Sequence, residues 1–127
     1  MRVACDTSVL IDFLRGDERA VSLLAGRAAE GDELWGVLVT RSELLAGMRS
    51  GERRATQALL DSLRWRDVDL ELADRAGELA RRYRRSDPSV ELADYLVAAG
   101  VDLLGATLLT LNTRRFPMFP DLELAYG

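Results

Sequence analysis

The strongest constraint on the fold is the stretch from Val3 to Asp12, which reads V-A-C-D-T-S-V-L-I-D. Short apolar residues lead to an acid, two hydroxyl residues follow, and a second apolar run begins. This order predicts a buried strand that turns directly into a helix, with Asp6 at the carboxyl end of the strand. Ligands of open α/β sheets bind in the crevice outside such strand ends. Asp6 is therefore either a helix cap or a site residue.

The rest of the chain alternates short apolar runs with helical patterns. Strands are predicted at residues 2–6, 34–39 and 106–111, with shorter candidates at 65–68 and 122–125. Helices are predicted at residues 8–15, 18–29, 43–50, 52–63, 72–83 and 90–99. This alternation predicts an α/β fold of three layers around a mostly parallel sheet of about four to five short strands. The length of 127 residues suits a single domain, residues 1–127.

Two absences in the composition exclude several kinds of chemistry. The chain has no His, which excludes Ser-His-Asp and Cys-His catalysis and His-ligated zinc. All 17 basic residues are Arg, which excludes Schiff-base chemistry and a P-loop lysine. The net charge of -4 argues against a general nucleic-acid binder. Because Cys5 is the single cysteine and no apolar run could span a membrane, we expect a cytoplasmic protein without membrane contact.

Acidic and amide side chains follow the predicted strands at one edge of the sheet. Asp6 ends the first strand, Glu43 lies in the first turn of the helix after the second, and Asn112 follows the strand at 106–111. Asp94 lies near the start of a helix that is otherwise apolar. An unpaired carboxylate in such a segment would be costly to bury, so Asp94 needs a partner. A cation that these side chains share would meet that need.

Carboxylate and amide oxygens suit Mg²⁺ or Mn²⁺ better than zinc. Carboxylates gathered without the cation would repel one another, so the empty site should be loose or partly protonated. Such a metal could activate water and stabilise the charge of a phosphate during in-line displacement. The chemistry that fits this ligand set is phosphodiester hydrolysis.

Four motifs in the sequence resemble those of PIN-domain proteins, and of VapC-type toxins in particular. They are D-T-S-V-L-I-D, R-S-E-L-L-A-G, L-A-D-Y-L-V-A-A and T-L-N-T-R-R-F-P-M-F-P-D-L, in this order over nearly the whole chain. The resemblance implies a PIN-like fold and a small Mg²⁺-dependent endoribonuclease, the toxin of a VapBC toxin-antitoxin pair. It also implies an inhibitory antitoxin partner, an RNA substrate and a homodimer.

Residue by residue, the resemblance assigns metal binding and catalysis to Asp6, Glu43 and Asp94, with Ser8 close to the site. The fourth acid of the family corresponds to Asn112, which supplies an oxygen but no charge and so puts a second metal in doubt. A further departure is Gly100, where the family often has Thr.

Two other functions remain open from the sequence. A PIN-like module could bind RNA or a protein partner without cleavage, and the missing charge at Asn112 favours this alternative. A phosphatase would share the acids, but Asp6 is followed by Thr7 and Ser8 and so lacks the D-x-D pairing. The arginines at residues 81–85 and 114–115 are explained either as solvated surface or as guides for phosphate.

Overall fold

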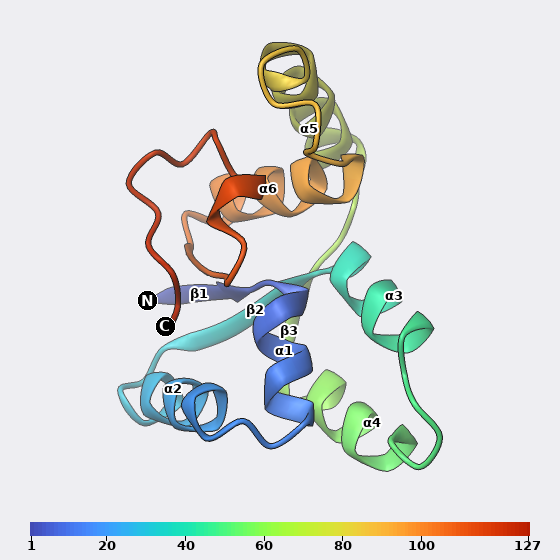
Figure 1. Cartoon of the computed structure of the whole chain (residues 1–127), viewed down its shortest axis with the longest axis vertical. Coiled ribbons are helices and arrows are strands. Elements are labelled where there is room, and N and C mark those ends of the chain that lie inside the picture. Colours follow the sequence, from blue (N-terminus) through green and yellow to red (C-terminus); the bar gives the residue numbers. More distant parts are fainter.

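The computed structural model describes the whole chain, residues 1–127, as alternating strands and helices (Figure 1). The strands are β1 (Arg2–Cys5), β2 (Glu33–Val37), β3 (Arg64–Arg66) and β4 (Thr107–Leu109). The helices are α1 (Thr7–Leu14), α2 (Glu18–Ala29), α3 (Leu38–Ala46), α4 (Arg53–Ser62), α5 (Leu70–Tyr83) and α6 (Leu92–Leu104), and a 3-10 turn, η1 (Thr113–Arg115), follows β4. No helix has the length and apolar character needed to cross a membrane.

The four strands form one parallel sheet in the order β3-β2-β1-β4. In the interior strand β1, Ala4 lies opposite Trp35 on one side and Leu108 on the other. Figure 1 shows α5 and α6 above the sheet, α1, α2 and α4 below it, and α3 beyond its edge. The predicted three-layer α/β/α fold with a parallel sheet is therefore confirmed. All carboxyl ends of the strands meet at one edge.

The two faces of the sheet carry different side chains, because successive residues of a strand point in opposite directions. Val3 and Cys5 face the helices below the sheet, whereas Ala4 faces α6. The leucine-rich face comprises Val3, Cys5, Val9, Leu10, Leu24, Leu44, Leu59, Leu60, Leu63 and Leu109. The alanine-rich face comprises Ala4, Val37, Leu72, Ala76, Ala80, Val90, Tyr95, Val97, Ala98, Ala99, Val101, Leu108 and Phe116.

Helix α6 packs so closely on the sheet that one of its positions has no room for a side chain. A Cβ atom added to Gly100 would lie 2.4 Å from Cγ2 of Val37, which is far inside a normal contact. Val37 is stiff at χ1, so it cannot easily turn away. This approach gives a structural reason for Gly100 at a position where the resemblance led us to expect Thr.

The predicted second strand at 34–39 is too long at its carboxyl end. β2 ends at Val37, and the chain enters α3 at Leu38 without an intervening loop. Thr40 and Leu44 are the buried residues of α3, and their spacing of four is helical. Because the apolar run continues past Val37, the change from strand spacing to helical spacing at Leu38 is not visible in the sequence. Glu43 consequently lies in the second turn of its helix, whereas the sequence predicted the first turn.

Two further expectations for the second half of the chain are wrong. The chain forms no strand at 122–125, because only one backbone hydrogen bond joins this segment to the end of β4, from the Ala125 N–H to the Thr110 carbonyl at 2.9 Å. The last helix continues to Leu104 instead of ending at residue 99. It stops where Gly105 adopts a positive φ of 62°, a conformation that favours glycine.

Candidate active site

A hollow of about 320 Å³ lies at the carboxyl edge of the sheet, and we name it the acidic hollow. Its walls include Asp6, Glu43, Asp94 and Asn112. These residues come from the end of β1, from α3, from the first turn of α6 and from the segment after β4. The structure therefore brings all four candidate residues together from distant parts of the sequence. The other lining residues are Thr7, Ser8, Ile11, Val97 and Arg115.

Asp6 is buried, and its carboxylate is held by hydroxyl groups. The residue occupies the N-cap position of α1, but its side chain makes no capping hydrogen bond. Its Oδ2 atom instead accepts hydrogen bonds from Oγ1 of Thr110 at 2.8 Å and from Oγ of Ser8 at 3.1 Å. The Ser8 oxygen in turn accepts one from the Leu111 N–H at 3.1 Å. The orientation of this carboxylate is therefore fixed by the hydroxyls of Thr110 and Ser8 and not by the helix terminus.

Glu43 is the exposed carboxylate of the hollow. Its Oε1 atom accepts a hydrogen bond from Oγ1 of Thr7 at 2.8 Å. Thr7 is the first residue of α1, so this contact ties α3 to the start of α1. The bond holds Glu43 beside the junction of β1 and α1, where Asp6 lies.

Asp94 is the third residue of α6 and is only 8% exposed. Its Oδ2 atom accepts a hydrogen bond from the Glu91 N–H at 2.9 Å and lies 3.5 Å from Nη1 of Arg115. Burial raises the pKa of Asp94, and the negative charge of Asp6 adds to the rise, while the Glu91 N–H and Arg115 oppose it. Burial therefore makes ionisation of Asp94 less favourable than in water, and added positive charge nearby would oppose this effect.

Asn112 lies on the exposed rim of the hollow, at the N-cap position of η1. Its side chain makes no capping hydrogen bond there. Its backbone N–H donates to Oγ1 of Thr110 at 3.0 Å, and Thr110 is fully buried. Thr110 thus links the backbone of Asn112 to the carboxylate of Asp6.

The acidic hollow has the donor atoms that Mg²⁺ or Mn²⁺ prefers, because its polar side chains offer carboxylate, amide and hydroxyl oxygens. Yet no group of three acidic or cysteine side chains lies close enough to hold a metal ion as the side chains stand. Each carboxylate is instead paired with a donor of the protein. The chemistry of the donor set fits such a cation, but the carboxylates share a hollow without forming a preassembled cage.

Sequence reasoning missed two lining residues that contact the carboxylates, Thr7 and Arg115. The sequence predicted no role for Thr7, and it predicted for Arg115 only a surface or phosphate-guiding role together with Arg114. Their positions next to Asp6 and three residues after Asn112 were the available signal. Cys5 adjoins the site but is no candidate nucleophile, because burial raises the pKa of its thiol to about 12.

The amino-acid sequence matches the model of the PIN domain family over residues 3–121. The chain belongs to the PIN-domain family. This PIN domain is 43% identical over 121 residues to Ribonuclease VapC19 of Mycobacterium tuberculosis, covering 95% of this chain and 97% of that protein. The predicted resemblance to VapC-type proteins is thus confirmed at the level of sequence.

The fold of this PIN domain also matches solved structures. VapBC2 from Rickettsia felis, bound to a DNA fragment from its promoter, superposes with a TM-score of 0.81 at 20% identity, covering 98% of this chain and 97% of that one. A toxin-antitoxin complex from Klebsiella pneumoniae gives a TM-score of 0.76 at 23% identity and covers 98% of both chains. At these identities the likeness concerns the fold.

Proposed function

We propose that this PIN domain is a metal-dependent endoribonuclease and the toxin of a VapBC toxin-antitoxin pair, acting in the cytoplasm. The observation that carries the proposal is the convergence of Asp6, Glu43, Asp94 and Asn112 on one hollow. The identity of 43% to a protein named Ribonuclease VapC19 supports RNA as the substrate.

Asp6, Glu43 and Asp94 are the residues that would hold Mg²⁺ or Mn²⁺ in this proposal, and Asn112 would support them with its amide oxygen. A bound cation would supply the charge that stabilises a phosphate and that lowers the pKa of water. It would also favour the ionised form of Asp94, whose pKa burial raises. The three carboxylates would have to approach one another when the cation binds.

The chain contributes orientation and charge balance in the proposed reaction. Ser8 and Thr110 both donate hydrogen bonds to Oδ2 of Asp6 and so hold its carboxylate. Thr7 holds that of Glu43. Arg115 offsets part of the negative charge at Asp94 and lies where a phosphate entering the hollow would meet it. With no His in the chain, no imidazole can serve as the general base.

Exchange of single acids for amides tests this proposal. Glu43→Gln and Asp94→Asn should each lower Mg²⁺-dependent cleavage of RNA by roughly a hundredfold or more, because even residues behind metal ligands cost 10- to 100-fold. Calorimetric titration should show weaker Mg²⁺ binding, and circular dichroism should show an intact fold.

Glu78→Gln is the matched control, because Glu78 is exposed on α5 and makes no ion pair. It should cleave RNA as the unaltered chain does. Cleavage that persists unchanged in both site variants, with contaminating nuclease excluded, would remove the assignment of the acidic hollow.

A second candidate function is a module that binds RNA or protein without cleaving. It is favoured by Asn112, which leaves the hollow one charge short of the family's four acids. Titration with Mg²⁺ separates the two candidates: an enzyme should yield metal-dependent products, while a binding module should retain RNA without any product.

The proposed partners are a cognate antitoxin and a second copy of this chain. The matched folds include VapBC2 and a toxin-antitoxin complex, which supports the first. Co-expression with the product of a small neighbouring open reading frame should give a stable complex with reduced cleavage. Light scattering on the purified chain should give twice the monomer mass of 14.1 kDa if it is a dimer.

A further inference from the structure

A second hollow adjoins the acidic hollow, and we name it the basic hollow. It measures about 450 Å³ and is lined by Ser89, Leu111, Asn112, Thr113, Arg114, Arg115 and Leu124. Asn112 and Arg115 also line the acidic hollow, so the two spaces share a wall. A ligand that extends beyond the acidic hollow on this side would pass these two residues and enter the basic one.

The charges of the two hollows are opposite. Three carboxylates line the acidic hollow, whereas the basic hollow has two guanidinium groups and no acid. Arg114 is exposed and makes no ion pair, so its charge is not offset within the chain. The hydroxyls of Ser89 and Thr113 and two leucines complete the walls. Guanidinium, hydroxyl and apolar groups together suit the phosphate, ribose and base of a nucleotide.

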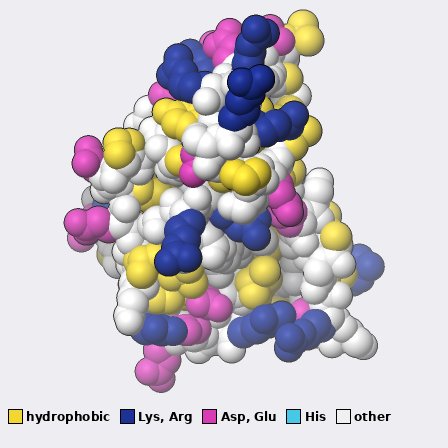
Figure 2. All heavy atoms as spheres, turned by 45° about the horizontal axis from the view of Figure 1, so that its top comes forward, with side chains coloured by type: hydrophobic (Ala, Val, Ile, Leu, Met, Phe, Trp, Pro, Cys, Tyr) yellow, Lys and Arg dark blue, Asp and Glu magenta, His cyan; other side chains and the backbone are white.

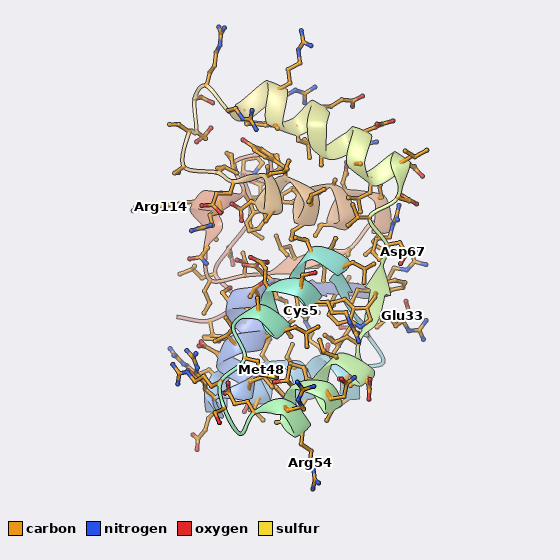
Figure 3. All side chains as sticks on the ribbon, turned by 90° about the vertical axis from the view of Figure 1, so that its right-hand side faces the viewer. Cys5, Glu33, Met48, Arg54, Asp67 and Arg114 are labelled. Carbon is orange, nitrogen blue, oxygen red and sulfur yellow. The ribbon has the colours of Figure 1, made fainter.

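The positive charge continues beyond the basic hollow. Ser89 follows the end of α5, where Arg81, Arg82, Arg84 and Arg85 are all exposed and form no ion pair. Figure 2 shows basic side chains gathered over the top of the molecule, where α5 ends. In Figure 3, Arg114 projects on the same side of the molecule as the loop that follows α5. A single strand leaving the acidic hollow would therefore meet basic side chains along this side.

We propose that the basic hollow is a subsite for the RNA nucleotide next to the phosphate that is cleaved, and that Arg114 binds the phosphate of that nucleotide. This inference rests on the proposed ribonuclease function and adds to it the path of the substrate. Arg114 acts in substrate binding and does not hold the cation. Its removal should weaken RNA binding while leaving the affinity for Mg²⁺ unchanged.

The test measures binding of a fluorescein-labelled, unstructured 12-nucleotide RNA by anisotropy. It uses the full chain with Glu43→Gln and Mg²⁺ present, and a gel verifies that the RNA stays intact. Adding Arg114→Gln should weaken binding about five- to tenfold. It should also reduce the slope of log affinity against log salt by about 0.7, the value for one phosphate contact of a single strand. Arg114→Lys should restore part of the affinity.

Arg54→Gln is the matched control. Arg54 is also exposed and makes no ion pair, but it lies on α4 and projects from the end of the molecule opposite α5 (Figure 3). It should change RNA affinity by less than about twofold, since a remote charge is largely screened by salt. In the cleaving chain, Arg114→Gln should raise KM and leave kcat nearly unchanged.

The outcomes separate the subsite from the function on which it rests. If the unaltered chain cleaves RNA with Mg²⁺ but Arg114→Gln and Arg54→Gln bind RNA equally well, the subsite is wrong and the nuclease stands. If Arg114→Gln lowers kcat or Mg²⁺ affinity instead of raising KM, its role as a substrate-binding residue is overturned. If the unaltered chain neither cleaves nor binds RNA, the proposed function fails, and the subsite fails with it.

Discussion

The two faces of the sheet achieve close packing by different means. On the leucine-rich face, large side chains such as Leu10 and Leu60 are fully buried and fill the space between helices and strands. On the alanine-rich face, Ala98, Ala99 and Gly100 let the backbone of α6 approach the sheet directly. Removing atoms should therefore damage the first face most, whereas adding atoms should damage the second most.

The acidic hollow lies where these two kinds of packing meet. Asp6 follows β1 and precedes α1, whose residues Val9 and Leu10 belong to the leucine-rich face. Asp94 belongs to α6, which lies on the alanine-rich face. The separation of these two carboxylates thus depends on how closely α6 approaches the sheet. Packing far from the hollow can alter the geometry of the hollow.

The largest effect is expected from removing a large side chain on the leucine-rich face. Leu10→Ala should lower the free energy of unfolding by about 3 kcal/mol or more, because a fully buried leucine leaves a cavity that its neighbours fill only in part. Urea denaturation measures the loss. Leu70→Ala, at a site that is 84% exposed, is the control and should cost less than about 0.5 kcal/mol. A loss below about 1 kcal/mol for Leu10→Ala would contradict our description of this face.

A smaller effect of the opposite kind is expected on the alanine-rich face. Gly100→Ala should lower the free energy of unfolding by about 2 kcal/mol, because its Cβ would lie 2.4 Å from Val37 and must displace α6 or β2. Displacement of α6 would also move Asp94, so Mg²⁺ affinity should fall by calorimetry.

Gly77→Ala in α5 provides the control for Gly100→Ala. Gly77 has no atom within 4 Å of an added Cβ, so alanine should stabilise the chain by about 0.5–1 kcal/mol through its helix propensity. Equal effects of the two substitutions in urea denaturation would show that helix propensity, not the close approach of α6, decides the outcome at Gly100.

The sequence predicted the layers well because strand and helix periods differ clearly over most of the chain. The order of strands and helices and the parallel sheet followed from apolar runs that alternate with helical spacing. The prediction failed at Val37-Leu38-Val39, where an apolar run continues across the change from β2 to α3. It also failed at the end of α6, which was placed at residue 99 although the helix continues to Leu104 and Gly105 is the glycine that ends it. Local patterns do not record where a continuous apolar segment changes its conformation.

The candidate site was predicted in part for a related reason. Asp6, Glu43 and Asn112 could be assigned to one edge because parallel strands align their carboxyl ends, whereas Asp94 was added because a carboxylate in an apolar helix needs a partner. Contacts made by single side chains could not be deduced in this way. The hydrogen bond between Thr7 and Glu43 depends on side-chain rotamers and on the position of Glu43 in the second turn of α3. The ion pair between Arg115 and Asp94 likewise depends on rotamers. Sequence spacing places Thr7 and Arg115 near the site, but it does not show which carboxylate each of them contacts.

The smallest effect is expected at the line where the two faces meet, and it compares two buried threonines. Thr110 donates a hydrogen bond to the carboxylate of Asp6, whereas the hydroxyl of the equally buried Thr56 has no partner. Thr110→Val should cost about 1–2 kcal/mol in urea denaturation, because the carboxylate and the Asn112 N–H both lose a partner. It should also weaken Mg²⁺ binding about 10-fold or more, since it frees the proposed ligand Asp6.

Thr56→Val should be neutral or slightly stabilising in the same measurement, because valine keeps the shape and removes an unpaired hydroxyl. If the two substitutions had the same effect on stability and on Mg²⁺ affinity, Thr110 would be a packing residue only, and the orientation of Asp6 would have to come from Ser8 alone.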